Sequence, residues 1–308
     1  MLLDEYTGFI FDLDGTIYRG DELLPGARRV IEEIKKADDK NHIFLSNKPI
    51  ARRENYARKL TDLGIETDVE EVINSSYVTA HYLQKRAEED IIYVIGERAL
   101  QEELVDAGLN VAADTRQDEL REEGSKIVSA AFSDGESRSD YDFLSFSPAG
   151  LDYEDVDWLV VSFDRTFHYG KLNDALQILN SGANFIATNP DNTCPVAGGE
   201  VPDAASMIAA VEAASGEKVD KIMGKPSQQM ITTALEAMGF DPDQKGQKGQ
   251  KDRSFLMIGD RLETDIRMGE EAGIGSAAVL TGVSTRADIS ASTVEPDHIL
   301  KSVEDLLK

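Results

Sequence analysis

Cysteine and basic residues are scarce in this sequence. Cys194 is the single cysteine among 308 residues, so no intramolecular disulfide is possible and a reducing compartment is the simpler interpretation. Lysine and arginine total 32 against 58 aspartate and glutamate residues, which gives a formal net charge of -26. A surface with this charge repels the phosphates of nucleic acids and of anionic lipids. We therefore expect neither a nucleic acid nor a membrane among the partners of this protein.

Long apolar runs are absent as well. No uninterrupted apolar segment approaches the roughly 20 residues that cross a bilayer as a helix. The N-terminal MLLDEYTG also lacks the basic stretch and the apolar stretch of a secretion signal. These absences predict a cytoplasmic protein. The sequence leaves the oligomeric state open, and a homo-oligomer is one possibility.

The acidic excess has two interpretations. The simpler one is a solvated surface, because charged residues are seldom buried and a large net charge mainly affects solubility. The other is adaptation to a high-salt cytoplasm, where screening within a few ångströms removes the self-repulsion of the surface. Residues 101–157 alone carry 16 acidic and 4 basic residues. We expect much of this segment, and the Lys-, Gly- and Gln-rich segment 243–252, to form exposed loops.

Short β-rich runs alternate with helical patterns along the chain. Such alternation is typical of βαβ units and therefore predicts an α/β fold with a parallel sheet. The predicted strands are 8–12, 42–46, 91–95, 127–132, 157–163, 184–188, 254–258 and 276–280. Apolar residues at intervals of three and four predict helices after Pro25, before Gly64 and before Gly239. The length and the 41% content of hydrophobic residues allow two domains with cores of their own.

The first predicted strand ends in two aspartates, within GFIFDLDGT. Residues two apart in a strand point to the same side, so Asp12 and Asp14 face one space while Leu13 faces away. Ligands of open α/β sheets bind at this carboxyl end of the strands. Gly15 then permits a sharp turn whose N–H groups can point at an anion. The plain alternative is a turn with two solvated aspartates.

Polar residues also follow later strands and loops. Ser46 and Asn47 end the strand of HIFLSNKP, and Lys225 lies between glycine and proline in IMGKPS. Asp260 and Asp265 follow the strand of SFLMIGDRLETDI. Each of these signals is weak alone, because serine and asparagine commonly cap helices and a lone lysine is usually a surface residue.

Four carboxylates in one space need compensating positive charge. They would repel one another unless a divalent cation and a lysine offset their charge. Acidic oxygens with open coordination positions suit Mg²⁺, which binds through one or two carboxylates, waters and a substrate phosphate. The set of strand-end residues therefore predicts Mg²⁺ together with an anionic ligand.

The motifs DLDGT, LSN, GKPS and GDRLETDI, in this order, resemble the four motifs of the haloacid dehalogenase superfamily of phosphohydrolases. The resemblance implies a Rossmann-like core, residues 1–76 and 204–308, and an inserted α/β cap domain, residues 77–203, that governs substrate specificity. This C2-type cap is similar to that of the branch with pyridoxal phosphatase, phosphoglycolate phosphatase and p-nitrophenyl phosphatases. Segments such as FIATNPD are most similar to sugar phosphatases encoded in arabinose operons.

The resemblance also implies the catalytic roles. Asp12 would be the nucleophile that forms an aspartyl-phosphate. Asp14 would protonate the leaving oxygen and then activate water as a base. Lys225 would stabilise both the nucleophile and the phosphate.

The remaining motif residues are implied to be ligands. Ser46 and Asn47 would hold the phosphoryl oxygens, together with the turn at Gly15. Mg²⁺ would bind the Asp12 carboxylate, the Asp14 backbone carbonyl and Asp260, while Asp265 would support the waters of the metal. The branch often has a second asparagine and then serine or threonine where this chain has Lys48 and Pro49, so the substrate stays open.

In this type of cap a loop faces the substrate. The resemblance implies that the loop is DRTFHY, with Arg165, His168 and Tyr169 as substrate-binding residues. Arg165 and His168 could bind a hydroxyl or a carboxylate of the substrate. The alternative is an ordinary loop on the surface of the cap.

The function that these residues predict is a Mg²⁺-dependent phosphatase acting on small phosphorylated metabolites, with sugar phosphates as the first substrate class. A phosphoglycolate or p-nitrophenyl-type phosphatase is the alternative within the same branch. A signalling receiver also gathers aspartates, a lysine and Mg²⁺, but it needs neither a second aspartate two residues on nor a large cap. A phosphomutase would transfer the phosphate to a second sugar hydroxyl.

Overall fold

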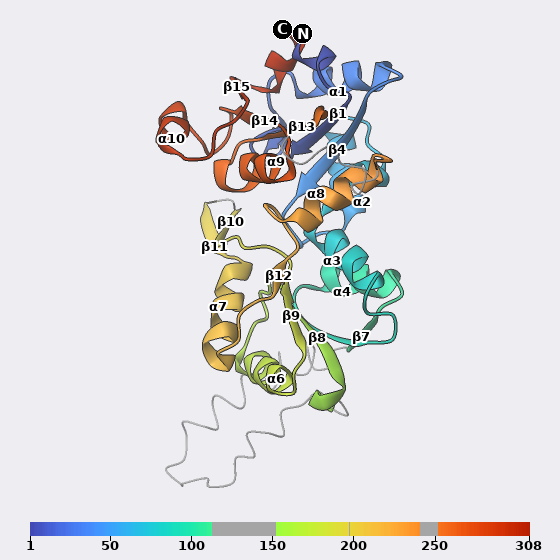
Figure 1. Ribbon diagram of the computed structural model, residues 1–308, viewed down its shortest axis with the longest axis vertical. Helices are drawn as coiled ribbons and strands as arrows, with labels where there is room; N and C mark the ends of the chain where they lie inside the picture. The colour runs from blue at the N-terminus through green and yellow to red at the C-terminus, as the bar shows by residue number, and fades with distance from the viewer. Residues whose placement is uncertain (113–151, 197, 241–251) are drawn as a thin grey trace. The chain divides into compact units, whose positions relative to one another are not determined.

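A computed structural model of the protein describes residues 1–112, 152–196, 198–240 and 252–308, and Figure 1 labels most of their helices and strands. The chain divides into two compact units. The first unit comprises Met1–Tyr82, Thr188–Pro190 and Ile222–Lys308, and the second comprises Leu83–Ala187 and Asp191–Lys221. Each unit is described here by itself.

The boundaries of the units differ from the predicted ones at residues 77 and 203. The second unit begins at Leu83 and extends to Lys221, apart from the short return to the first unit at Thr188–Pro190. Residues 204–215 fall within the segment assigned to the core, but they form helix α7 (Ala204–Ser215), which packs against helix α6 (Tyr169–Asn180) and belongs to the second unit. Composition gave no signal for this helix-to-helix contact.

A six-stranded parallel sheet forms the centre of the first unit, in the order β15-β14-β13-β1-β4-β5. Its strands are β1 (Gly8–Asp12), β4 (Asn41–Ser46), β5 (Val72–Asn74), β13 (Asp252–Gly259), β14 (Ile274–Val279) and β15 (His298–Leu300). Strand β1 pairs with both β13 and β4, and all five of its residues are buried, as expected in a sheet covered on both faces. The carboxyl ends of these three strands therefore bring Asp12, Ser46 and Asp260 to the same edge.

The helices of the first unit pack through the apolar faces that the sequence predicts. The buried residues of α1 (Ala27–Lys36) are Ala27, Val30, Ile31 and Ile34. They share one core with Phe9, Phe11 and Phe44 of the sheet. The remaining helices are α2 (Arg53–Asp62), α3 (Ser75–Gln84), α8 (Gln228–Ala237), α9 (Arg267–Ala272) and α10 (Arg286–Ala291). Helices α2 and α8 are the ones predicted to end before Gly64 and Gly239.

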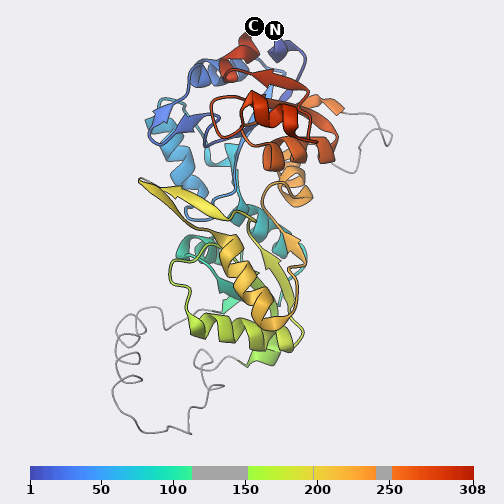
Figure 2. The same cartoon turned by 90° about the vertical axis from the view of Figure 1, so that its left-hand side faces the viewer.

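The second unit has a five-stranded sheet in the order β12-β9-β8-β6-β7. Its strands are β6 (Ile91–Ile95), β7 (Asn110–Ala112), β8 (Val156–Val161), β9 (Asn184–Ala187) and β12 (Lys221–Ile222). The pairs β6/β7, β6/β8 and β8/β9 are parallel. Helix α4 (Arg98–Asp106) packs on β7, whereas α6 and α7 lie side by side and both contact β8 (Figure 2). The predicted fold class, parallel sheets with flanking helices, is thus confirmed.

Several short elements were not predicted, because two to five residues are too few for a periodic pattern to develop. They include strands β5, β7, β12 and β15 and two antiparallel hairpins. The hairpins are β2 (Tyr18–Arg19) with β3 (Glu22–Leu23), and β10 (Thr193–Val196) with β11 (Gly199–Pro202). The short helices are η1 (Leu2–Asp4), η2 (Val69–Glu71), η3 (Tyr153–Asp155), η6 (Val303–Leu307) and the π-helix η5 (Leu262–Ile266).

Some predictions lie outside the described residues. They are the strand 127–132, the loop 243–252 up to the start of β13, and the middle of the acidic segment 101–157. The described ends of that acidic segment form α4, β7 and η3, so these parts are not loop. Among the helices described here, none has both the length and the apolar character needed to cross a membrane.

His42 of β4 is a histidine buried in the first unit. Its side chain is 3% exposed, and its ring lies edge-on to Phe44 with centroids 5.1 Å apart. Nε2 lies 3.6 Å from Oε1 of Glu71. Burial lowers the pKa of His42 to about 4, although Glu71 acts in the opposite direction. The folded protein therefore holds this imidazole neutral at neutral pH.

We predict that this histidine makes the protein less stable in mild acid. The unfolded chain binds a proton at a pKa near 6.5, whereas the folded chain resists it, so the free energy of unfolding falls as the pH drops from about 6.5 towards 4. The contribution of this group is on the order of 3 kcal/mol. Urea unfolding across this pH range should show a shallower loss for His42→Gln than for the wild type. Replacement of the partly exposed His81 by Gln is the control, and parallel curves for His42→Gln and wild type would refute the prediction.

Candidate active site

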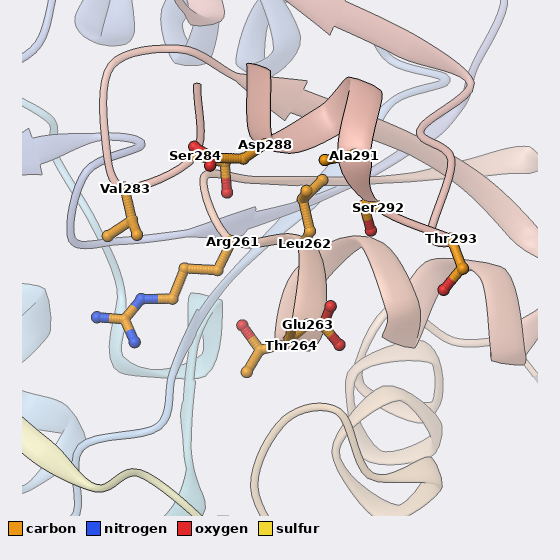
Figure 3. A pocket seen from close by; sticks show the side chains of 10 residues that line it. All are labelled: Arg261, Leu262, Glu263, Thr264, Val283, Ser284, Asp288, Ala291, Ser292 and Thr293. Carbon is orange, nitrogen blue, oxygen red and sulfur yellow. The ribbon is translucent and has the colours of Figure 1, made fainter. Parts of the chain in front are cut away.

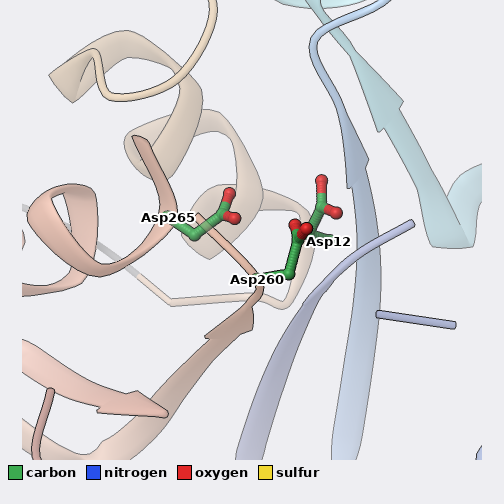
Figure 4. Close-up of side chains that lie close together, drawn as sticks. All are labelled: Asp12, Asp260 and Asp265. Carbon is green, nitrogen blue, oxygen red and sulfur yellow. The ribbon is translucent and has the colours of Figure 1, made fainter. Parts of the chain in front are cut away.

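Three buried carboxylates form a cluster at the edge of the first sheet (Figure 4). Asp12 ends β1, Asp260 directly follows β13, and Asp265 lies in η5. Each offers one oxygen, and these oxygens all lie within 4.8 Å of one another. Because β1 and β13 are paired neighbours, their ends meet, and η5 carries Asp265 back to the same place. The structure thus brings together three of the four predicted carboxylates.

Lys225 is the buried cation of this cluster. It lies in the loop before α8, and its Nζ is ion-paired with Oδ1 of Asp12 and, at 2.8 Å, with Oδ1 of Asp265. Burial alone would lower the pKa of Lys225, but the charges of Asp12 and Asp265 outweigh this effect and raise it. Lys225 therefore carries a full positive charge. When all three carboxylates are ionised, one ammonium group leaves two negative charges without a partner.

The pKa values of the carboxylates indicate that the cluster requires a further cation to hold all of them ionised. Burial, and then repulsion by Asp265 and Asp260, raises the pKa of Asp12 well above its usual range, although Lys225 lowers it. Burial and Asp265 raise the pKa of Asp260 to about 6. Oδ1 of Asp260 is buried and accepts no hydrogen bond from the described residues. This donor set, with its unsatisfied oxygen and two excess negative charges, fits a divalent cation that prefers oxygen ligands.

The loop after β14 holds the other oxygen of Asp260. The Val283 N–H donates to Oδ2 of Asp260 at 2.6 Å, and the Thr281 hydroxyl donates to the Gly15 carbonyl at 2.6 Å. A Cβ atom on Gly282 would lie 1.8 Å from the same Oδ2, so only glycine fits there. The sequence motifs did not identify this loop. Gly282, which follows the predicted strand 276–280, could have indicated it, because this strand (β14) pairs with β13.

Asp14 lies outside the carboxylate cluster and has a partner of its own. Its side chain is 40% exposed, and Oδ2 lies 2.9 Å from Nζ of Lys48. The sequence indicated Lys48 only as a departure from the expected motif. The structure shows what the departure does: it places an ammonium group against the carboxylate that was predicted to move the proton.

The residues predicted to bind phosphate have different surroundings. Ser46 is buried, and its hydroxyl accepts a hydrogen bond from the Lys48 N–H at 3.2 Å, so its own hydrogen remains available for a phosphoryl oxygen. The Gly15 N–H donates to the Tyr18 carbonyl at 2.8 Å, so this group is already used within the turn. The Asn47 amide is hydrogen-bonded to the Lys225 backbone.

The predicted substrate loop of the second unit is held by internal contacts. Arg165 donates from Nε and Nη2 to the two carboxylate oxygens of Glu97, at 2.8 and 3.0 Å. Nδ1 of His168 accepts from the Gly170 N–H at 3.0 Å and thereby caps α6, while Tyr169 is 70% exposed. Arg165 and His168 therefore have structural roles within this unit, and a role in substrate binding stays a prediction.

A buried ion pair that the sequence did not reveal organises this loop. Nζ of Lys171 lies 2.7 Å from Oδ2 of Asp164, and both side chains are buried. The Thr166 hydroxyl donates to Oδ1 of Asp164 and accepts from Lys171, each at 2.7 Å. With every charge paired and hydrogen-bonded, this network fixes the loop that carries Arg165 and His168.

The first unit has a pocket of about 600 Å³ whose lining includes Arg261 and Thr264, the chain neighbours of Asp260 and Asp265 (Figure 3). Its walls carry the hydroxyl groups of Thr264, Ser284, Ser292 and Thr293, together with charged side chains. Arg261 also lines it and extends away from Ser292 and Thr293 in Figure 3. None of the residues predicted for catalysis or phosphate binding lines this pocket, so it is distinct from the carboxylate cluster.

Comparisons with known proteins identify relatives over nearly the whole chain. The profile of the haloacid dehalogenase-like hydrolases matches residues 9–110, and a second HAD-hydrolase-like profile matches residues 222–306. Sugar-phosphatase AraL of Bacillus subtilis is 34% identical over 301 residues, which cover 98% of this chain and 92% of that protein. The 4-nitrophenylphosphatase of Thermotoga maritima matches with a TM-score of 0.77 and 30% identity over 99% of this chain and 98% of that one. The glycerol phosphate phosphatase of Mycobacterium tuberculosis, in complex with magnesium, shares the fold with a TM-score of 0.76 at 24% identity, over 99% of this chain and 77% of that one.

The chain belongs to the haloacid dehalogenase-like hydrolases, as the order of its four motifs predicted. Within this family it is a phosphatase, since its similarity to sugar-phosphatase AraL and to the 4-nitrophenylphosphatase extends over nearly the whole chain.

Proposed function

We propose that this phosphatase hydrolyses small phosphorylated metabolites with Mg²⁺, through an aspartyl-phosphate on Asp12. The observation that carries the proposal is the buried cluster of Asp12, Asp260 and Asp265 around Lys225. Phosphate monoester hydrolysis is among the slowest uncatalysed reactions, and its transition state needs mainly positioning and charge stabilisation. A fixed ammonium group and a set of metal-binding oxygens provide both.

Mg²⁺ is the cation that suits these ligands. The carboxylates of Asp12 and Asp260 would hold it together with the backbone carbonyl of Asp14. Asp265 would support its waters, because one of its oxygens is ion-paired with Lys225 and the other accepts a hydrogen bond from the Arg261 N–H. The bound ion would offset the two excess negative charges and the charge of the phosphoryl group. The magnesium complex of the Mycobacterium tuberculosis phosphatase, which has the same fold, supports the choice.

The other residues divide the work between phosphate binding and proton transfer. An oxygen of Asp12 would attack phosphorus, and Lys225 would hold both this carboxylate and a phosphoryl oxygen. The Ser46 hydroxyl would donate to a second phosphoryl oxygen. Asp14, which keeps contact with solvent, would protonate the leaving oxygen and then take a proton from the attacking water.

Sugar phosphates are the substrate class that we propose first. The support is the 34% identity to sugar-phosphatase AraL across the chain. Phosphoglycolate and p-nitrophenyl phosphate are the alternatives, and the second has support from the Thermotoga maritima enzyme. Lys48 contacts Asp14 and would therefore form part of the wall next to the leaving group, so the substrate needs direct measurement.

A panel of phosphorylated compounds tests the proposed function. Phosphate release would be measured with and without Mg²⁺ for sugar phosphates, phosphoglycolate, glycerol phosphate, pyridoxal phosphate, nucleotides and p-nitrophenyl phosphate. We expect hydrolysis that requires Mg²⁺ and is fastest for a sugar phosphate. Absence of release from every compound would refute the proposal. Transfer of phosphate to an added sugar acceptor would identify a mutase instead, and a phosphorylated protein that persists for minutes would identify a receiver.

Gly282 provides a prediction about metal binding. In Gly282→Ala the new Cβ would lie 1.8 Å from Oδ2 of Asp260, so the carboxylate must move away from its place beside Asp12. The concentration of Mg²⁺ for half-maximal activity should rise by about 10-fold or more, because a misplaced ligand costs binding energy. Gly199→Ala is the matched control, since nothing lies within 4 Å of its added Cβ. Equal Mg²⁺ dependence in Gly282→Ala and wild type would contradict the ligand role of Asp260.

A further inference from the structure

The side-chain amide of Asn47 is bound to both polar groups of the Lys225 backbone. Oδ1 of Asn47 accepts from the Lys225 N–H at 2.7 Å, and Nδ2 donates to the Lys225 carbonyl at 3.2 Å. An amide that makes this pair of bonds fixes a peptide segment as a neighbouring strand would, in position and in orientation. The contact joins the end of β4 to the loop that carries the buried ammonium group.

The backbone of Asn47 is itself held in place by its neighbours. The hydroxyl of Ser75, the first residue of α3, donates to the Asn47 carbonyl at 2.7 Å. Strand β4, which precedes Asn47, lies in the sheet beside β1. The amide therefore projects from a well-packed part of the first unit, and its two hydrogen bonds restrict the movement of the loop that carries Lys225.

Gly224 provides the room for this contact. A Cβ atom at this position would lie 2.7 Å from Oδ1 of Asn47 and 2.7 Å from the Thr188 carbonyl. The Gly224 N–H donates to that same Thr188 carbonyl at 2.7 Å, so hydrogen bonds hold the loop both at Gly224 and at the next residue, Lys225. The close approach explains the glycine that precedes Lys225 in the GKPS motif.

We infer that Asn47 is a positioning residue for Lys225 and not a ligand of the phosphate. The sequence resemblance implied a phosphate ligand, but both polar atoms of the amide are directed at the Lys225 backbone. Asn47 and Gly224 together place the ammonium group between Asp12 and Asp265, where it contacts the nucleophile. This inference rests on the proposed function of Lys225 in phosphoryl transfer.

A double-mutant cycle separates the two roles. The four proteins are wild type, Asn47→Ala, Lys225→Met and the double variant, assayed for kcat with p-nitrophenyl phosphate and Mg²⁺ and for the Kd of inorganic phosphate. We expect Asn47→Ala to lower kcat by about 10- to 100-fold in the wild-type background, because a displacement near 1 Å has that cost. In the Lys225→Met background the same change should cost less than about 3-fold, because a positioning residue has nothing left to position. Equal losses in both backgrounds would overturn the inference.

Gly224→Ala supplies a second test that keeps both Asn47 and Lys225 in the sequence, because the new Cβ would push the Asn47 amide away from the Lys225 backbone. It should reproduce the loss of kcat of Asn47→Ala, and a wild-type kcat in this variant would overturn the inference. Asn74→Ala is the control for stability, because Asn74 is a buried asparagine of neighbouring β5 whose amide also binds two backbone groups. If the wild type hydrolyses no substrate, the Kd values of inorganic phosphate for the four proteins still complete the double-mutant cycle. That result would refute the proposed function and leave the positioning role of Asn47 to be decided by the Kd values.

Discussion

Asp12→Asn is expected to lower kcat by about 10⁴-fold or more, as replacement of a nucleophile does in other enzymes. An amide oxygen is a poor nucleophile, and the substitution also removes the charge that pairs with Lys225. The measurement is phosphate release from the best substrate of the panel at saturating Mg²⁺.

The fold of Asp12→Asn should survive, which makes the loss of activity interpretable. Asparagine has nearly the size of aspartate, and the change removes one of three mutually repelling carboxylates from a buried cluster. The midpoint of urea unfolding should therefore stay the same or rise. A stable variant with more than about a hundredth of the wild-type kcat would exclude Asp12 as the nucleophile.

Asp14→Asn should give the second-largest effect, a fall in kcat of about 10²- to 10⁴-fold. The asparagine cannot deliver a proton to the leaving oxygen, nor can it take one from water. The Mg²⁺ concentration for half-maximal activity should not change, because the Asp14 side chain lies outside the carboxylate cluster and only its backbone carbonyl is assigned to the metal.

Lys48→Gln is the matched control for Asp14→Asn. It removes the ion pair at 2.9 Å but keeps the Asp14 carboxylate, so it should retain much more activity. If Asp14→Asn keeps both a normal rate and a normal Mg²⁺ dependence, the proton-transfer role is excluded. If it instead loses Mg²⁺ activation, the Asp14 side chain is a metal ligand.

The sequence predicted the elements that have a clear apolar pattern. The strand beginning at Gly8 has its predicted place because it is a short apolar run that is buried throughout, and the helix at Ala27 because its buried apolar residues recur at intervals of three and four. The predicted set of Asp12, Asp260, Asp265 and Lys225 also comes together, because parallel strands end at one edge of a sheet.

The contacts between distant loops could not be predicted. The binding of Asn47 to the Lys225 backbone and the position of Gly282 against Asp260 depend on the packing of loops whose spacing carries no periodic signal. The second compact unit extends to Lys221, beyond the predicted boundary at residue 203. Helix α7 has a regular pattern, but the pattern does not say which of two sheets the helix covers.

Chemical trapping of the intermediate tests the central claim most directly. The wild-type protein would be quenched in acid during turnover of a radiolabelled substrate with Mg²⁺, and borohydride would reduce any acyl phosphate to an alcohol that peptide mapping locates. The account predicts label in the quenched protein, reduction at Asp12 and no label in Asp12→Asn. Rapid phosphate release with no label on the protein, or with reduction at another residue, would contradict it.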